Sequence, residues 1–188
     1  MSEIIPEDRA ALNDVGKSHV IIRRVFPGKD NENKRGQPRS YLFVVEEGRI
    51  LALSQKRPVV PEGVLVKFKK YEPKFKDGEE LFFQIKANPV TFETRDGKTK
   101  KRPILGDGRT PWLEDELSTR GCEVLAATVA SSGVVKGTYR PNRPPLTLNS
   151  VLFTGRLRVK DGGRLAKAVM NGIGSGKAYG FGMLMLAR

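Results

Sequence analysis

The chain has 188 residues and a hydrophobic content of 38%, which suffices for one ordinary domain or two small ones. Its formal net charge of +13, spread along the chain, favours nucleic acid as the partner over an anionic membrane surface, and no apolar stretch reaches the length of a membrane span. A single cysteine and a single histidine exclude an internal disulfide and a zinc site of the usual Cys/His kind.

The first half of the chain alternates between patterned segments and turn residues. Its predicted elements are a short strand at residues 2–5, a helix at 7–26, a basic loop at 28–39, strands at 41–46 and 49–54 around a tight Glu47-Gly48 turn, and a strand at 80–86. A second helix would fall near residues 58–63, where the sequence specifies little more than a turn.

The second half carries a comparable series. It consists of a basic stretch at 91–105, a helix at 111–120, a strand at 123–130, a Pro/Arg-rich excursion at 131–145, a strand at 148–159, a helix at 163–170 and a strand at 183–186. Each half approximates the β-α-β-β-α-β order of a ferredoxin-like unit. We therefore predict an α+β fold of two tandem ferredoxin-like (RRM-like) units, residues 1–88 and 89–188, joined near Ala87-Asn88-Pro89.

A terminal glycine loop (residues 172–182) lies between the last helix and the last strand. Five glycines leave its backbone N–H groups open to a polyanion, and Lys177 adds charge, which favours a phosphate contact. The loop is not a Walker A motif, because Ala178 follows Lys177, and it follows a helix where a dinucleotide fingerprint would follow a strand. The alternative is a glycine-rich helix C-cap and turn.

Four segments carry a resemblance to a known family. They are residues 14–27 (DVGKSHVIIRRVFP), residues 81–89 (LFFQIKANP) with 97–103 (GKTKKRP), residues 150–159 (SVLFTGRLRV) and the terminal glycine loop. Each is weak alone, but together and in this order they form a specific combination that covers nearly the whole chain. On these residues the chain resembles the CasE family, the CRISPR repeat-processing endoribonucleases of type I-E Cascade in the RAMP superfamily.

This resemblance implies a metal-independent endoribonuclease without a cofactor. Such an enzyme binds the repeat hairpin of precursor RNA and cuts it at the base of the 3′ side. The upstream 2′-hydroxyl attacks the scissile phosphate and leaves a 2′,3′-cyclic phosphate and a 5′-hydroxyl, a reaction that needs positioned side chains. The product stays bound. The implied partners are the RNA stem-loop and other Cascade subunits, with target DNA reached only through the complex.

His19 matches the catalytic histidine of the family. An imidazole titrates near neutral pH and therefore suits proton transfer. The alternative is a buried structural histidine, because His19 lies beside a helical apolar stripe that contains Val15 and Ile22. The family often has a tyrosine shortly before this histidine, where the chain has Gly16-Lys17-Ser18. Lys17 or Arg23 is near enough on the helix to stabilise transition-state charge.

Three basic elements suit the backbone of an A-form stem. The predicted RNA-binding residues are Lys86 with Lys98, Lys100, Lys101 and Arg102 around the junction of the units, Lys136, Arg140 and Arg143 in an extended hairpin or loop, and Gly174, Gly176 and Lys177 in the terminal glycine loop. The alternative for each cation is solvated surface that protects strand edges from pairing.

Three hypotheses remain from the sequence. The first is a cutting Cascade subunit, the second is a subunit of the same fold that holds the hairpin without cutting it, and the third is a basic ferredoxin-like RNA-binding or ribosome-associated protein with a structural histidine. The acidic start of the chain has no signal pattern, so we expect a cytoplasmic protein with no membrane partner. The sequence contains neither a D-x-D nor an H-x-x-x-H motif, which disfavours metal catalysis.

Overall fold

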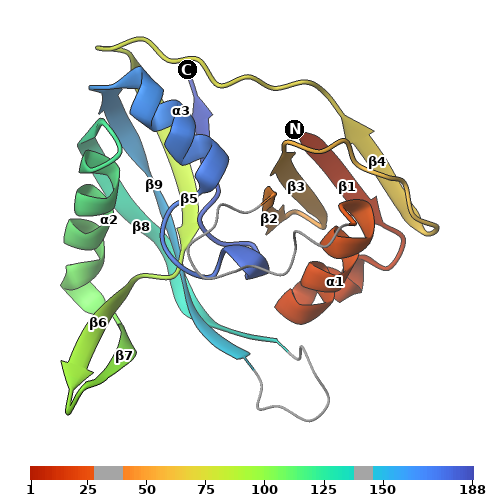
Figure 1. Cartoon of the computed structure of the whole chain (residues 1–188), viewed down its shortest axis with the longest axis horizontal. Coiled ribbons are helices and arrows are strands. Elements are labelled where there is room, and N and C mark those ends of the chain that lie inside the picture. Colours follow the sequence, from red (N-terminus) through yellow and green to blue (C-terminus); the bar gives the residue numbers. More distant parts are fainter. Residues whose placement is uncertain (28–39, 138–145) are drawn as a thin grey trace.

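The computed structural model describes residues 1–27, 40–137 and 146–188, and these form two antiparallel sheets with helices packed on them (Figure 1). The basic loop predicted at residues 28–39, together with Arg140 and Arg143, lies outside the described residues. Each main sheet has four strands, and a two-stranded hairpin stands apart from both.

The first sheet has the strand order β2-β3-β1-β4, which is the order of a ferredoxin-like unit. Its strands are β1 (Ser2–Pro6), β2 (Tyr41–Glu46), β3 (Arg49–Ser54) and β4 (Val64–Phe68). Glu47 and Gly48 both have positive φ, as a tight hairpin turn between β2 and β3 requires. The helix α1 (Val15–Val25) covers one face of this sheet and packs Ile22 and Val25 against Phe43 and Ile50.

The helix predicted over residues 7–26 is broken at Asp14. A short 3₁₀ helix, η1 (Arg9–Asn13), precedes α1, and Asp14 between them has extended backbone angles. The Asp14 carboxylate accepts hydrogen bonds from the backbone N–H groups of Gly16 and Lys17 at 2.6 and 3.1 Å. Asp14 is therefore the N-cap of α1, which fixes the turn of the helix that presents His19.

The fourth strand of the first sheet is β4, and this corrects the prediction that the strand at residues 80–86 completes that sheet. That strand, β5 (Glu80–Ala87), pairs instead with β9 and β10 of the second sheet. Residues 55–63 between β3 and β4 contain no helix, as the weak signal there indicated. The chain passes from one sheet to the other between Phe68 and Glu80.

The second sheet has the order β10-β5-β9-β8, again the ferredoxin-like order. Its remaining strands are β8 (Cys122–Gly137), β9 (Leu146–Val159) and β10 (Leu184–Ala187), and its helices are α2 (Arg109–Ser118) and α3 (Gly162–Asn171). Leu117 of α2 and Leu165 of α3 lie with Phe83, Ile85 and other sheet residues in one core. The predicted fold of two tandem ferredoxin-like units is confirmed, although the described part of the first unit lacks the second helix.

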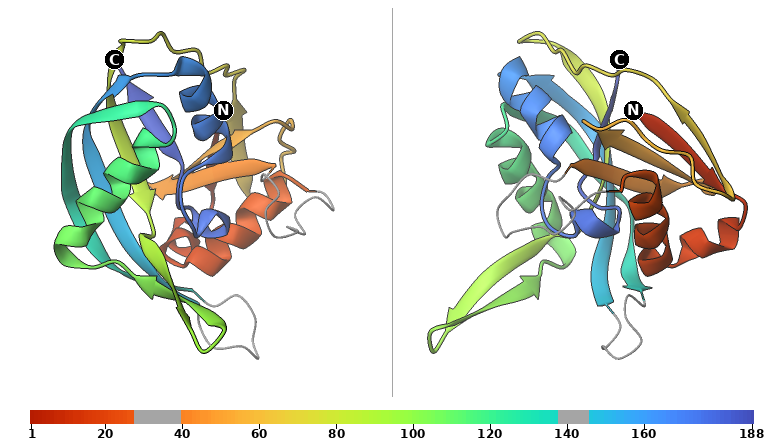
Figure 2. Two further views of the ribbon diagram at one scale, coloured as in Figure 1. Left: turned by 60° about the vertical axis from the view of Figure 1, so that its left-hand side comes forward. Right: turned by 45° about the vertical axis from the view of Figure 1, so that its right-hand side comes forward.

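Two basic segments of the second half are more regular than predicted. Residues predicted only as a basic stretch form the basic hairpin, β6 (Val90–Arg95) and β7 (Lys98–Pro103), inserted between β5 and α2. Residues 131–137, predicted as part of an irregular excursion, continue β8 and pair with β9 up to Gly137 and Leu146. The basic hairpin projects from the packed sheets, whereas the extension of β8 and β9 runs beside α1 (Figures 1 and 2).

Candidate active site and nucleic-acid interface

His19 lies where α1 of the first unit meets the end of the chain. Its side chain is buried, with 8% of the residue exposed, and its Nδ1 is 2.7 Å from the carbonyl oxygen of Ala178. Its ring also lies against that of Tyr179, with centroids 5.5 Å apart and an interplanar angle of 40°. Because a carbonyl only accepts, Nδ1 of the neutral ring donates the proton, and the lone pair is then on Nε2.

The terminal glycine loop places Ala178 opposite α1. A single 3₁₀ turn, η4 (Lys177–Tyr179), begins after Gly176 and ends before Gly180, and both of these glycines are left-handed with φ of 83° and 82°. The N–H of Tyr179 donates to the Gly176 carbonyl at 2.8 Å and closes the turn. Left-handed residues on both sides reverse the chain sharply, a geometry that favours glycine.

Other glycines of the loop are required by packing within the protein. A Cβ on Gly182 would lie 2.2 Å from the Ile173 carbonyl oxygen, and one on Gly172 would lie 2.8 Å from the side chain of Leu42. At these two positions the structure supports the interpretation of the glycines as a helix C-cap and turn, and not as residues that leave the backbone open to a phosphate. The RNA contacts predicted for Gly174 and Gly176 stay predictions; both residues are partly exposed.

The loop is fastened to the end of β5. The Gly182 N–H donates to the carbonyl of Lys86 at 2.7 Å, and the side-chain amide of Asn88 donates to Ser175 Oγ at 3.0 Å, which in turn donates to the Asn88 carbonyl at 3.2 Å. Two of the segments that carry the family resemblance, the Ala-Asn-Pro turn and the glycine loop, are therefore in direct contact. Asn88 and Ser175 have no functional signal of their own in the sequence.

Lys86 is the one member of the predicted junction group that lies at the junction. Its ammonium is 5.3 Å from the ring centroid of Phe181, and burial lowers the pKa of Lys86. Lys86 and Tyr179 also line a pocket of about 310 Å³ between the units, together with Arg9 and Val15. A desolvated cation beside a pocket suits an anionic ligand such as a phosphate.

The prediction that the other four members of that group surround the junction is wrong. Lys98, Lys100, Lys101 and Arg102 are exposed on β7 of the basic hairpin, which projects from the molecule and does not surround the junction (Figure 2). Lys101 lies over the exposed ring of Phe92 at 5.7 Å. Arg102 makes an ion pair with Glu93 at 2.8 Å. Binding of RNA by these cations stays a prediction.

Lys136 is exposed near the described end of β8, beside the start of α1. A Cβ on the next residue, Gly137, would lie 2.4 Å from the Val15 side chain, so a glycine there lets the strand touch the helix. The long β8–β9 arm and the helix that carries His19 are therefore neighbours. Lys17 and Arg23 are exposed on that helix.

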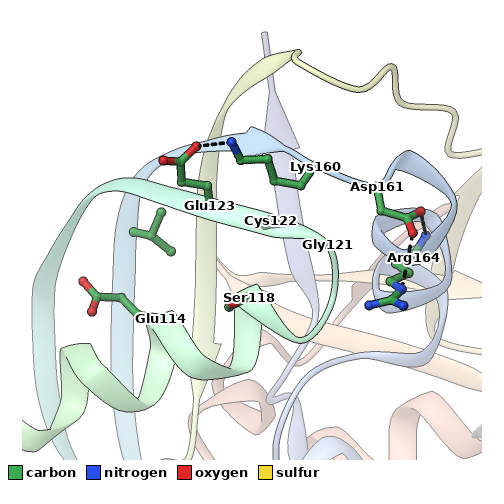
Figure 3. A pocket seen from close by; sticks show the side chains of 9 residues that line it. Glu114, Ser118, Gly121, Cys122, Glu123, Lys160, Asp161 and Arg164 are labelled. Carbon is green, nitrogen blue, oxygen red and sulfur yellow. Dashed lines mark hydrogen bonds and ion pairs between the residues drawn. The ribbon is translucent and has the colours of Figure 1, made fainter.

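A larger cavity lies elsewhere. It has a volume of about 790 Å³ and is lined by α2, β8, α3 and the residues next to them, without a residue of α1 or the terminal glycine loop (Figure 3). Four of its charged residues form two ion pairs, with Lys160 2.8 Å from Glu123 and Arg164 3.3 Å from Asp161. Burial raises the pKa of the Cys122 thiol to about 11, so this cysteine is no nucleophile near neutral pH.

The described residues hold neither a metal-binding cluster nor a membrane-spanning helix. Across residues 1–27, 40–137 and 146–188, no three His, Cys, Asp or Glu side chains are grouped so that they could hold a metal ion. In the same part of the chain, no helix has both the length and the apolar character of a membrane span.

Comparison with known proteins places the chain in a family. Residues 3–188 match the family described as CRISPR associated protein, and the chain belongs to this family. Over 208 residues it is 29% identical to the CRISPR-associated endoribonuclease Cse3 of Thermus thermophilus, covering 97% of this chain and 95% of that protein. It is 26% identical to the Cascade subunit CasE of Escherichia coli over 197 residues, which cover 95% of this chain and 94% of that protein. The predicted membership of the CasE type is confirmed.

A solved structure shares the whole fold. Thermus thermophilus Cse3 bound to an RNA that represents a pre-cleavage complex superimposes with a TM-score of 0.82 at 24% identity, covering 100% of this chain and 98% of that one. The arrangement of two ferredoxin-like units is therefore common to both proteins.

Proposed function

We propose that the protein is the repeat-processing endoribonuclease of a type I-E Cascade. In this proposal it cuts the hairpins of precursor CRISPR RNA in the cytoplasm and stays on the mature guide as a subunit, contacting target DNA only through the complex. The observation that carries the proposal is the setting of His19, whose imidazole is fixed between the two units with Nδ1 on a backbone carbonyl. This arrangement is the one that a general base needs.

The chemistry follows from the tautomer. Nε2 of His19 accepts the proton of the 2′-hydroxyl as the 2′-oxygen bonds to phosphorus. The bond from phosphorus to the 5′-oxygen breaks, the leaving oxygen takes up a proton from solvent to give a 5′-hydroxyl, and the His19 imidazolium releases to solvent the proton that it accepted. The other product is a 2′,3′-cyclic phosphate, so neither water, metal nor cofactor is consumed. General base catalysis of this kind contributes roughly 10²–10⁴-fold to a rate.

The remaining residues supply positive charge near the scissile phosphate and contacts to the RNA stem. Lys177 follows Gly176 in the loop that touches His19, and half-buried Lys86 lies at the base of the same loop. We assign them to the phosphates near the cut, where fixed positive charge offsets the developing negative charge. The basic hairpin and Lys136 extend outward and suit the backbone of the stem. The relatives are an endoribonuclease and a Cascade subunit by name, which supports both parts of the proposal.

The decisive experiment uses two RNAs. The purified protein is incubated in EDTA with its cognate repeat hairpin and with the same hairpin carrying a 2′-deoxy substitution at the scissile nucleotide. We expect cleavage of only the unmodified RNA and a cyclic-phosphate end on the product. Cleavage of the deoxy hairpin, or a strict need for added metal, would contradict the mechanism.

A second candidate function is a subunit that holds the hairpin without cutting it. The observation that favours it is the Gly16-Lys17-Ser18 sequence, which replaces the family tyrosine shortly before His19. Under this alternative both RNAs bind tightly and neither is cut. The third hypothesis, a basic RNA-binding protein from outside the family, is wrong, because residues 3–188 match the CRISPR associated protein family.

A further inference from the structure

We propose that Tyr179 is the positioning residue of His19 and that the terminal glycine loop is thereby part of the active site. This inference rests on the proposed function. The Ala178 carbonyl and the Tyr179 ring hold the imidazole in one tautomer and one plane.

Two neighbouring groups of the loop meet the imidazole. They belong to consecutive residues of one 3₁₀ turn, Ala178 through its carbonyl at 2.7 Å and Tyr179 through its ring at 5.5 Å between centroids. That separation is within the range in which aromatic rings attract each other. The hydrogen bond fixes which nitrogen carries the proton, and the ring contact limits rotation about the bond to Cγ. Together they leave the imidazole one orientation.

The turn that carries both groups is itself rigid. A positioning group is useful only if it is held, and η4 is held at both ends by left-handed glycines. A Cβ on Gly180 would lie 3.2 Å from the ring of Phe43 in the first sheet. The hydrogen bond from Gly182 to Lys86 and the paired hydrogen bonds between Asn88 and Ser175 tie the loop to the second sheet. The turn is therefore located by both units.

The tautomer of His19 links this geometry to the rate. A neutral imidazole exchanges between two tautomers, and the hydrogen bond of one nitrogen decides which tautomer is present. Only the tautomer with the proton on Nδ1 offers Nε2 as a base. Loosening Tyr179 frees the ring to tilt away from the Ala178 carbonyl. The expected result is a slower cut with unchanged RNA binding, the pattern that follows when a base is no longer oriented.

The single histidine of the chain makes the proposal directly measurable. Because His19 is the only histidine, the ring ¹⁵N signals of histidine-labelled protein report on this residue without assignment. The variants are Tyr179→Leu, which removes the ring, and Tyr179→Phe, which keeps it. Tyr71→Leu is the matched control, since Tyr71 is exposed in the segment between β4 and β5. Tyr179→Met replaces Tyr179→Leu if the latter does not fold.

We expect wild type, Tyr179→Phe and Tyr71→Leu to show the proton on Nδ1, and Tyr179→Leu to show a mixture of tautomers. Single-turnover cutting should fall about 10- to 100-fold in Tyr179→Leu and be retained in Tyr179→Phe, with unchanged affinity of all variants for the 2′-deoxy hairpin. An unchanged tautomer in Tyr179→Leu overturns the proposal, as does an equal loss of cutting in Tyr179→Phe. The ¹⁵N spectra are recorded without RNA, so a wild type that binds but does not cut refutes the proposed function separately.

Discussion

The basic hairpin and the terminal glycine loop are both candidate RNA contacts by sequence, yet they are physically opposite. Every residue of β7 in the hairpin is exposed, and the hairpin projects away from the sheets. In the loop, Ile173 and Phe181 are fully buried, and backbone hydrogen bonds fix it to α3 and β5. A basic or glycine-rich sequence thus predicts that a segment contacts RNA, but it does not predict whether that segment is an exposed arm or a packed loop. We expect the hairpin to set affinity and the loop to set the rate of cutting.

The largest effect should come from the residue that the loop positions. His19→Ala should lower single-turnover cutting by roughly 10²–10⁴-fold, because the proton acceptor is gone, while leaving hairpin affinity near that of wild type. The control is Val20→Ala, which changes the adjacent exposed residue of the same helix. Quench-flow or gel kinetics with a labelled repeat measure the rate. If His19→Ala weakens binding as much as cutting, the division between the two regions is wrong.

The second prediction concerns the stability lost when a glycine is replaced in the terminal glycine loop or in the basic hairpin. Gly182→Ala should lower the free energy of unfolding by about 3 kcal/mol, because the new Cβ meets a backbone carbonyl and the residue has positive φ. Gly97→Ala in the turn of the basic hairpin is the matched change, with φ of 70° but nothing within 4 Å of the new Cβ. It should cost only about 1 kcal/mol, the strain of the left-handed conformation. Urea unfolding followed by circular dichroism measures both variants, and equal losses would contradict the contrast.

The hairpin should respond in affinity. Replacing Lys98 and Lys100 together by glutamine should weaken hairpin binding and reduce the slope of log K against log salt by about 1 for each phosphate that is no longer neutralised. The rate of cutting at saturating protein should not change. A matched control replaces Lys70 and Lys74, which removes the same charge from the segment between the sheets. Fluorescence anisotropy over a salt series gives both numbers, and an equal slope change in the control would show a general charge effect instead.

The smallest effect concerns an ion pair within the hairpin. Glu93→Gln should release Arg102 from its 2.8 Å ion pair and remove one negative charge beside the RNA backbone. Exposed ion pairs contribute about 0.2–1 kcal/mol, so we expect only a few-fold gain in affinity and almost no change in stability. The same anisotropy assay, repeated at high salt where the gain should vanish, tests this expectation.

Several elements are predictable because their signals are local. The strands β2 and β3 with the Glu47-Gly48 turn, the helices α2 and α3, and the long strand β9 follow from periodicity and turn residues in their own segments. The family resemblance predicts His19 and the terminal glycine loop as site residues, and their roles stay predictions. The break at Asp14 is hidden because the apolar stripe runs through it, although an aspartate before Val15 is also a helix N-cap signal.

Other features depend on partners that periodicity does not name. The alternation of β5 is the same whichever sheet it joins, so the order of elements along the chain predicts the wrong sheet for it and passes over the short, partly charged strand β4. The basic hairpin has no buried face, so its sequence lacks the alternation of apolar and polar residues that would predict two paired strands. The hydrogen bond between His19 and the Ala178 carbonyl joins residues 159 apart in sequence, and no spacing rule reaches that far.

The hydrogen bond between His19 and Ala178 joins the two ends of the chain, so its formation costs the closure entropy of a long loop. The sheets and the helix α1 must be in place to bring the two residues together. Local unfolding near either end therefore releases the imidazole from its carbonyl partner, while the exposed cations of the basic hairpin stay as they are. The proposed cutting is thus more sensitive to loosening of the chain ends than the proposed binding of RNA.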